Sequence, residues 1–197
     1  MNDPDDALIR QAKAGDKVAF GKLASRYYEM AYAVAYGVLH HHESARDVTQ
    51  EVFLKVFREI AHFEGKSKFK TWLYRVTVNA ALDEARKKKH VISLDATDAS
   101  EDEEERPVVI PDKAAGPRER ASQRELRELL DKAISILSED HRAVLVLREW
   151  QELSYDEIAE ILGIEIGTVM SRLYYARKKL GEMLKMDFGE KALKENI

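Results

Sequence analysis

Cysteine is absent from the 197 residues of this chain, which excludes disulfide bonds, thiolate metal sites and cysteine nucleophiles together. No apolar run approaches the roughly 20 residues that a helix needs to cross a bilayer. The first ten residues are acidic, whereas a signal peptide begins with basic residues that an apolar stretch follows. We therefore expect a cytoplasmic protein that does not insert into a membrane.

Proline is also scarce, and three of the 4 prolines stand in one segment, residues 91–117. That segment holds 2 basic and 8 acidic residues, five of them consecutive at 101–105. Its negative charges repel one another and it is too polar to bury a core, so it is typical of a flexible linker. The predicted organisation is a first domain at 1–92, an acidic flexible linker at 93–117, a second domain at 118–186 and a C-terminal tail at 187–197.

The first domain shows the three- and four-residue spacing of apolar residues that is typical of amphipathic helices. This spacing predicts a short helix at about 7–14 and three longer helices with apolar stripes at 20–38, 48–60 and 70–88. Asp16 and Ser44 are predicted N-caps. Gly65 and the basic run 86–89 are predicted to mark helix ends, where a cation suits the helix dipole. Phe53 and Phe57 are assigned to the apolar stripe of the 48–60 helix.

The second domain carries the signals of a helix-turn-helix. Ser138 is expected to cap a helix that ends near Trp150, and Ser154 with Glu157 has the spacing of a capping box. Gly163 ends the short helix after that box, a tight turn covers 164–167, and a last helix buries Val169, Leu173 and Ala176. The chain is therefore predicted to be all-α, with two helical domains joined by the acidic linker.

Three blocks of the sequence resemble the extracytoplasmic-function (ECF, group IV) sigma factors of bacterial RNA polymerase. They are DVTQEVF at 47–53, TWLYRVTVN at 71–79 and GTVMSRL at 167–173. They stand in the order and spacing of that family, and the chain is similar in particular to its envelope-stress branch. The resemblance implies a non-enzymatic factor without a cofactor. It would bind core RNA polymerase and direct promoter-specific initiation in a stress or envelope response.

The resemblance also implies a role for each domain. The first, as sigma region 2, would bind the clamp of the largest polymerase subunit and recognise and open the minus-10 element of the promoter. The second, as sigma region 4, would read the minus-35 element in the major groove and contact the flap of the second-largest subunit. An anti-sigma factor that covers both domains is a further candidate partner.

Helical spacing, read together with this resemblance, selects three groups of candidate site residues. The polar stripe opposite the apolar side of the 48–60 helix is the candidate core polymerase surface: Asp47, Gln50, Glu51 and Lys55. Cations, aromatic rings and polar side chains suited to a flipped minus-10 base are Lys66, Lys68, Phe69, Lys70, Trp72, Arg75, Asn79, Asp83 and Arg86. The candidate minus-35 contacts on the last helix are Thr168, Ser171, Arg172, Tyr174, Tyr175 and Lys178. Trp72 is open to two interpretations, a core residue or a stacking platform.

The last helix departs from the family pattern at two positions. Family members commonly carry a basic residue where this chain has Met170 and Tyr175. Neither side chain is able to donate a bidentate pair of hydrogen bonds to guanine. The usual guanine-containing minus-35 sequence is therefore in doubt for this chain.

Two other function classes compete with a sigma factor. A freestanding helix-turn-helix regulator holds DNA by its own basic surface, whereas residues 118–197 carry 14 basic and 16 acidic side chains. A metalloenzyme built on His40, His41, His42 and Glu43 would need consecutive residues to converge on one ion, which is rare, and no further ligand motif accompanies them. We expect a solvated turn there, no metal site and no catalytic residues.

Overall fold

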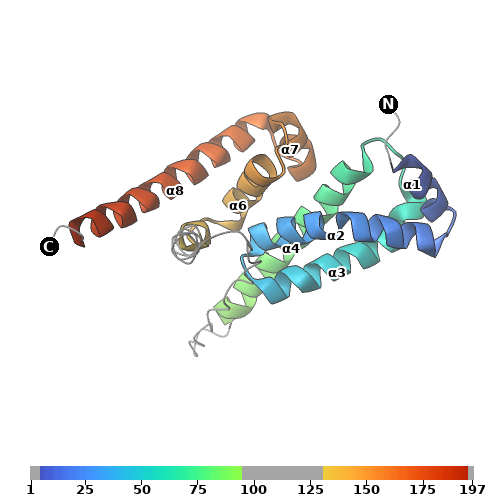
Figure 1. Ribbon diagram of the computed structural model, residues 1–197, viewed down its shortest axis with the longest axis horizontal. Coiled ribbons are helices and arrows are strands. Elements are labelled where there is room, and N and C mark those ends of the chain that lie inside the picture. The colour runs from blue at the N-terminus through green and yellow to red at the C-terminus, as the bar shows by residue number, and fades with distance from the viewer. Residues whose placement is uncertain (1–4, 95–130, 195–197) are drawn as a thin grey trace, which may run out of the picture.

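The computed structural model describes residues 5–94 and 131–194, and within these ranges it contains helices and no strand (Figure 1). The first domain consists of α1 (Asp6–Lys13), α2 (Lys17–Leu39), α3 (His42–Glu59), the 3-10 turn η1 (Ile60–His62) and α4 (Phe69–Leu94). The all-α prediction is confirmed. The predicted linker lies outside the described residues, apart from its first two residues, which end α4.

Helix α2 begins where the sequence predicts, because the side chain of Asp16 accepts hydrogen bonds from the backbone N–H groups of Val18 at 2.8 Å and Ala19 at 3.1 Å. Its apolar stripe packs into the core, where Leu23 and Val34 are fully buried. Helices α2, α3 and α4 pack against one another, so this bundle determines which sides of α3 and α4 face solvent.

Several local details of the first domain differ from the prediction. His41, and not Ser44, caps α3: its Nδ1 accepts from the backbone N–H of Ser44 at 3.2 Å. Helix α3 ends at Glu59, and Gly65 lies in the following loop with a φ of +72°. Helix α4 continues past the basic run 86–89, which therefore does not stand at a helix end. Phe57 is 43% exposed instead of buried, with its ring edge-on to Phe20.

The second domain contains α6 (Glu139–Leu145), the π-helical turn η2 (Val146–Trp150), α7 (Tyr155–Leu162) and α8 (Ile166–Lys194). The predicted capping box is confirmed, with Ser154 N–H donating to Glu157 at 2.8 Å and Glu157 N–H donating to the Ser154 hydroxyl at 3.2 Å. Gly163 ends α7 with a φ of +64°. Helix α8 begins at Ile166, inside the predicted turn and two residues earlier than expected, and continues through residue 186, where the predicted second domain ends.

Ser138 stands at the predicted N-cap of α6, although its side chain does not cap that helix. Its hydroxyl instead lies 2.5 Å from Nδ1 of His141. The prediction that this helical segment ends near Trp150 is confirmed, since η2 continues α6 to that residue. Helices α7 and α8, with the turn between them, form the predicted helix-turn-helix.

The two domains pack against each other, and α6 lies between α2 of the first domain and α8 of the second (Figure 1). Six consecutive residues, 142–147, are buried as a result. Gly37 of α2 permits the contact: a Cβ at this position would lie 2.4 Å from Cγ2 of Val146 and 2.8 Å from Cζ3 of Trp150. Only the absence of a side chain lets α2 and η2 approach this closely.

Within 5–94 and 131–194, no helix combines the length and the apolar character that crossing a membrane requires.

Candidate functional site

Helix α3 presents one polar face to solvent. The four predicted side chains Asp47, Gln50, Glu51 and Lys55 are all exposed on it, whereas Val48, Val52 and Val56 on the other side are at most 3% exposed. Leu54 lies among the polar side chains and is 61% exposed. Sequence reasoning missed this leucine, although its place outside the apolar stripe was a visible signal. The α3 face therefore combines acidic side chains with apolar surface.

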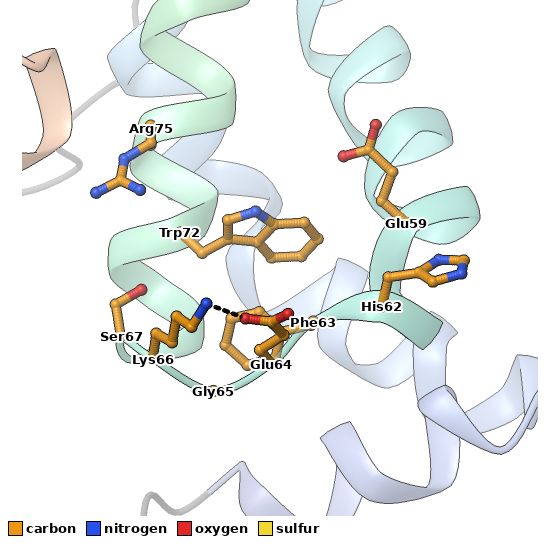
Figure 2. A pocket seen from close by; sticks show the side chains of 9 residues that line it. All are labelled: Glu59, His62, Phe63, Glu64, Gly65, Lys66, Ser67, Trp72 and Arg75. Atoms are coloured by element: carbon orange, nitrogen blue, oxygen red, sulfur yellow. Dashed lines mark ion pairs between the residues drawn. The ribbon is translucent and has the colours of Figure 1, made fainter.

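A pocket of about 420 Å³ lies between η1, the loop after it and the first turns of α4 (Figure 2). Its lining comprises Glu59, His62, Phe63, Glu64, Gly65, Lys66, Ser67, Trp72 and Arg75. Figure 2 shows the Trp72 ring pointing from α4 toward η1, whereas Arg75 points away from α4 on the other side. Trp72 is half-buried, with ring centroids 5.1 Å from Phe63 and 5.8 Å from Phe69. Trp72 thus packs on the core and also lines the pocket.

The prediction that placed Phe69 in the loop beside DNA is wrong. Phe69 is the first residue of α4 and only 2% exposed, packed edge-on against Phe63 at 5.9 Å between ring centroids. A ring buried in this way is not available for stacking on a base. Its position follows from α4 beginning one residue before the predicted start, which places Phe69 on the inner side of the helix.

Three lysines of the loop and of the start of α4 are exposed, as predicted: Lys66, Lys68 and Lys70. Lys66 forms an ion pair with Glu64 at the rim of the pocket (Figure 2). The ammonium of Lys70 lies 5.5 Å from the centroid of the Tyr74 ring. Of the three, only Lys66 lines the aromatic pocket, and Lys68 and Lys70 are exposed nearby in the sequence. Cations beside an aromatic hollow suit the phosphates around an unstacked base.

The four predicted residues farther along α4 do not stay together. Asn79, Asp83 and Arg86 are exposed, and Arg86 forms an ion pair with Asp83 at 3.1 Å. Arg75 instead reaches the second domain. Its Nη2 donates to the carboxylate of Glu160 on α7 at 3.0 Å and to the backbone carbonyl of the same residue at 3.1 Å.

Two further contacts between the domains were missed by sequence reasoning. Tyr74 is 1% exposed, and its hydroxyl donates to Oε1 of Gln151 at 2.8 Å. Burial, aided by the negative charge of Glu157, raises the pKa of Tyr74. Lys89 donates to Glu139 at 2.7 Å. Burial opposes ionisation of Glu139, but the hydrogen bonds from Lys89 and from the backbone, together with the positive charges of Lys89 and Arg142, outweigh it and lower the pKa of this carboxyl. A buried tyrosine hydroxyl needs a partner, yet a partner 77 residues away is not visible in a sequence pattern.

Helix α8 presents a face of unusual composition to solvent. Met170, Tyr174 and Tyr175 are 52%, 62% and 59% exposed, and Ser171 and Lys178 are exposed beside them. The opposite side of the helix is buried against α6 and α7. Two predicted contacts lie apart from this group, since Thr168 is half-buried and Arg172 is bound by Asp140 of α6 at 2.8 Å.

The histidine segment is not the solvated turn that the sequence predicts. His42 stacks on Tyr36 at 4.3 Å between ring centroids, and its Nδ1 lies 2.7 Å from the hydroxyl of Tyr32. His40 is half-buried in a left-handed conformation with a φ of 54°, and burial lowers its pKa. In the described part of the chain, no three or more His, Cys, Asp or Glu side chains gather in a way that could hold a metal ion.

Both domains match known sequence families. The chain matches Sigma-70 region 2 over residues 23–91 and Sigma-70, region 4 over residues 127–180. It is 34% identical over 177 residues to the ECF RNA polymerase sigma factor SigW of Bacillus subtilis, and the matched segment covers 90% of this chain and 95% of SigW. It is 35% identical over 177 residues to the ECF RNA polymerase sigma-E factor of Escherichia coli K12, covering 89% and 92%.

Two solved structures have a similar fold over most of the chain. CnrH, in complex with the cytosolic domain of CnrY, has a TM-score of 0.65 and 26% identity, covering 94% of this chain and 99% of CnrH. The sigma factor RpoE, in complex with the anti-sigma factor NepR from Bartonella quintana, has a TM-score of 0.66 and 26% identity, covering 85% and 98%.

Proposed function

We infer how this chain acts in transcription from the family to which it belongs, the extracytoplasmic-function sigma factors of RNA polymerase. It is a sigma factor, a non-enzymatic initiation factor that works with core RNA polymerase at promoter DNA. Matches to both region 2 and region 4 in one chain do not favour the alternative of a freestanding helix-turn-helix regulator. Three surfaces, on α3, beside Trp72 and on α8, are the candidates to carry this function.

The core polymerase surface that we propose is the exposed face of α3, directed at the clamp of the largest subunit. The support for this proposal is that exposed Leu54 lies among the acidic side chains of Asp47 and Glu51. A helix face that only meets solvent does not need an exposed leucine. Acidic side chains attract a basic partner and set its register, while the leucine supplies apolar area to bury.

For the minus-10 element, we propose that the pocket beside Trp72 holds a base flipped out of the duplex. The half-buried Trp72 ring offers a surface for stacking, and Asn79 offers a polar edge on the same helix. The exposed lysines at 66, 68 and 70 would lie along the phosphates of the opened strand.

The second domain would place α8 in the major groove of the minus-35 element and would contact the flap of the second-largest subunit. We also propose an anti-sigma factor as a regulator, since the similar sigma factor RpoE was solved in complex with one. We place the protein in the cytoplasm, where polymerase works. Its place in a stress or envelope response rests on the sequence resemblance alone.

The observation that carries the proposal is the presence of a region 2 bundle and a region 4 helix-turn-helix in one chain. The test is run-off transcription with core polymerase and fragmented genomic DNA. We expect discrete transcripts that depend on this protein. Absence of specific transcripts would contradict the proposal, and tight binding to a specific duplex without polymerase would favour a freestanding regulator instead.

A further inference from the structure

The solvent-facing side of α8 is defined here as the outer face, and it consists of Gly167, Met170, Ser171, Tyr174, Tyr175 and Lys178. These residues recur at three- and four-residue steps, so they lie along one side of the helix. Val169, Leu173 and Ala176 on the opposite side are at most 1% exposed. The outer face is therefore the part of the helix-turn-helix that is free to enter a groove.

The outer face offers mainly apolar and aromatic surface. Met170, Tyr174 and Tyr175 are each more than half exposed, and the two tyrosine rings lie edge to face with centroids 5.4 Å apart. The Ser171 hydroxyl donates to the backbone carbonyl of Thr168 at 3.0 Å, so its proton is used within the helix. Lys178 supplies the one cationic side chain of this face.

The two arginines of α8 whose side chains are described do not join the outer face. The guanidinium of Arg172 donates to Asp140 at 2.8 Å, and its side chain is 27% exposed. Arg177 donates twice to Glu149, at 2.6 Å and 3.1 Å, and this hydrogen bonding raises its pKa. Each arginine is thus held by a carboxylate of its own domain, and its contact with a base would compete with that ion pair.

We propose that the outer face recognises the minus-35 element through the methyl groups of thymine and not through the edge of guanine. Guanine is read by a bidentate pair of donors from Arg or Lys, whereas thymine exposes a methyl group that apolar side chains contact. Met170 and Tyr174 present such apolar surface, and Lys178 would hold a phosphate, which positions the helix without reading sequence. This inference rests on the proposed function and names the kind of DNA that the same helix would select.

The test uses the holoenzyme and a promoter duplex obtained from the run-off selection. One duplex carries deoxyuridine in place of each minus-35 thymine, which removes only the methyl group. A second carries 7-deazaguanine in place of each minus-35 guanine, which removes the N7 acceptor. We expect binding about fourfold weaker for each contacted methyl group that is lost, and unchanged binding for the 7-deaza duplex. Unchanged binding of the uracil duplex, or weaker binding of the 7-deaza duplex, would overturn the proposal.

Variants then assign the effect to the outer face. Met170→Ala and Tyr174→Ala should each reduce the preference for thymine over uracil, whereas Val18→Ala, a change at an exposed apolar residue of α2, should leave it intact. A preference unchanged in both α8 variants would overturn the assignment and leave a protein partner as the occupant of this face. A holoenzyme that starts transcription at no specific site would contradict the sigma function itself. That outcome differs from specific initiation by a holoenzyme that reads guanine, which would contradict only the proposal about thymine.

Discussion

Arg75 of α4 and Glu160 of α7 join the two domains, because the arginine donates both to the carboxylate and to the backbone carbonyl of the glutamate. Arg75 is also a candidate minus-10 contact, and one guanidinium nitrogen that is bound to Glu160 is not available to a phosphate. Promoter contact by this nitrogen would require the Glu160 contact to open first.

Truncating either partner separates the two roles of Arg75. Both side chains are well exposed, at 39% and 55%, so the pair is worth only about 0.2–1 kcal/mol. We expect both Arg75→Ala and Glu160→Ala to speed amide exchange in α7 of the free protein, with the smaller effect in Glu160→Ala because the backbone carbonyl of residue 160 remains. Only Arg75→Ala should reduce permanganate reactivity of minus-10 thymines in the holoenzyme. An equal loss in Glu160→Ala would show that Arg75 acts only through the domain contact.

Charge reversal on the α3 face should weaken the complex with core polymerase. Glu51→Lys places a cation where an acidic side chain would meet a basic partner, and adding Asp47→Lys should deepen the loss. Exposed substitutions of this kind usually change stability by less than about 0.5 kcal/mol, so the fold should survive. Glu29→Lys on α2 makes the same charge change at another exposed site. A pull-down in which Glu51→Lys and Glu29→Lys retain equal amounts of core would rule out this surface.

Promoter opening should depend on Asn79 and on the exposed lysines at 66, 68 and 70. We expect Asn79→Ala and Lys68→Ala to lower permanganate reactivity at the minus-10 element while duplex binding by the holoenzyme is kept, because an unpaired base needs polar edges and nearby cations. Lys87→Ala is the matched control, since Lys87 is an exposed cation elsewhere on α4. Full opening by both Asn79→Ala and Lys68→Ala would place the base-binding site elsewhere.

Gly37→Ala should favour the helical backbone of α2 but disrupt the contact of α2 with η2 of the second domain. Alanine in place of a glycine within a helix normally adds about 0.5–1 kcal/mol of stability, but here its Cβ would collide with Val146 and Trp150. We expect α2 and η2 to separate in this variant, and amide exchange in η2 to become faster as a result. Gly21→Ala is the control on the same helix, since its Cβ would meet nothing within 4 Å, and it should only stabilise. Identical exchange in η2 for both variants would contradict the packing described for Gly37.

Stability should fall in mild acid because of His40. Burial lowers the pKa of His40 from its usual 6.5, with Arg142 and His42 acting in the same direction against the opposing charge of Asp131. The unfolded chain therefore takes up a proton first, and stability is lost as the pH falls through about 6.5. His40→Asn, a residue that tolerates the positive φ, should reduce the difference in unfolding free energy between pH 7.5 and pH 5.5. Denaturant titrations at the two pH values measure this difference, and an unchanged one would exclude His40 as its source.

Local signals predicted the fold well, because each acts within a few residues. Asp16, the Ser154 and Glu157 box and Gly163 all do in the structure what their chemistry favours. The His41 cap was missed because histidine is not among the usual capping residues. The burial of Phe69 was missed because a helix start that moves by one residue turns a loop aromatic into a core residue.

Contacts between the domains could not be predicted in this way. Tyr74 and Gln151, or Gly37 and Val146, meet only after two separately encoded bundles have packed, and no short-range pattern records that packing. The same limit applies to Arg172, whose helical position suggested a groove contact until Asp140 of a different helix proved to hold it. The polar face of α3 lies where helical spacing predicted, whereas the pocket includes only Lys66, Trp72 and Arg75 of the predicted minus-10 residues. The roles of both surfaces stay predictions.

The burial of residues 142–147 on every side has a consequence for temperature. This stretch is shielded by α2 on one side and by α8 on the other, so parting the domains would bring Val146 and its apolar neighbours into water. Exposing apolar surface to water raises the heat capacity. The hydrophobic stabilisation that keeps such surface buried therefore weakens on cooling. The contact between the two domains should therefore weaken at low temperature, while the capped helices on either side of it remain folded.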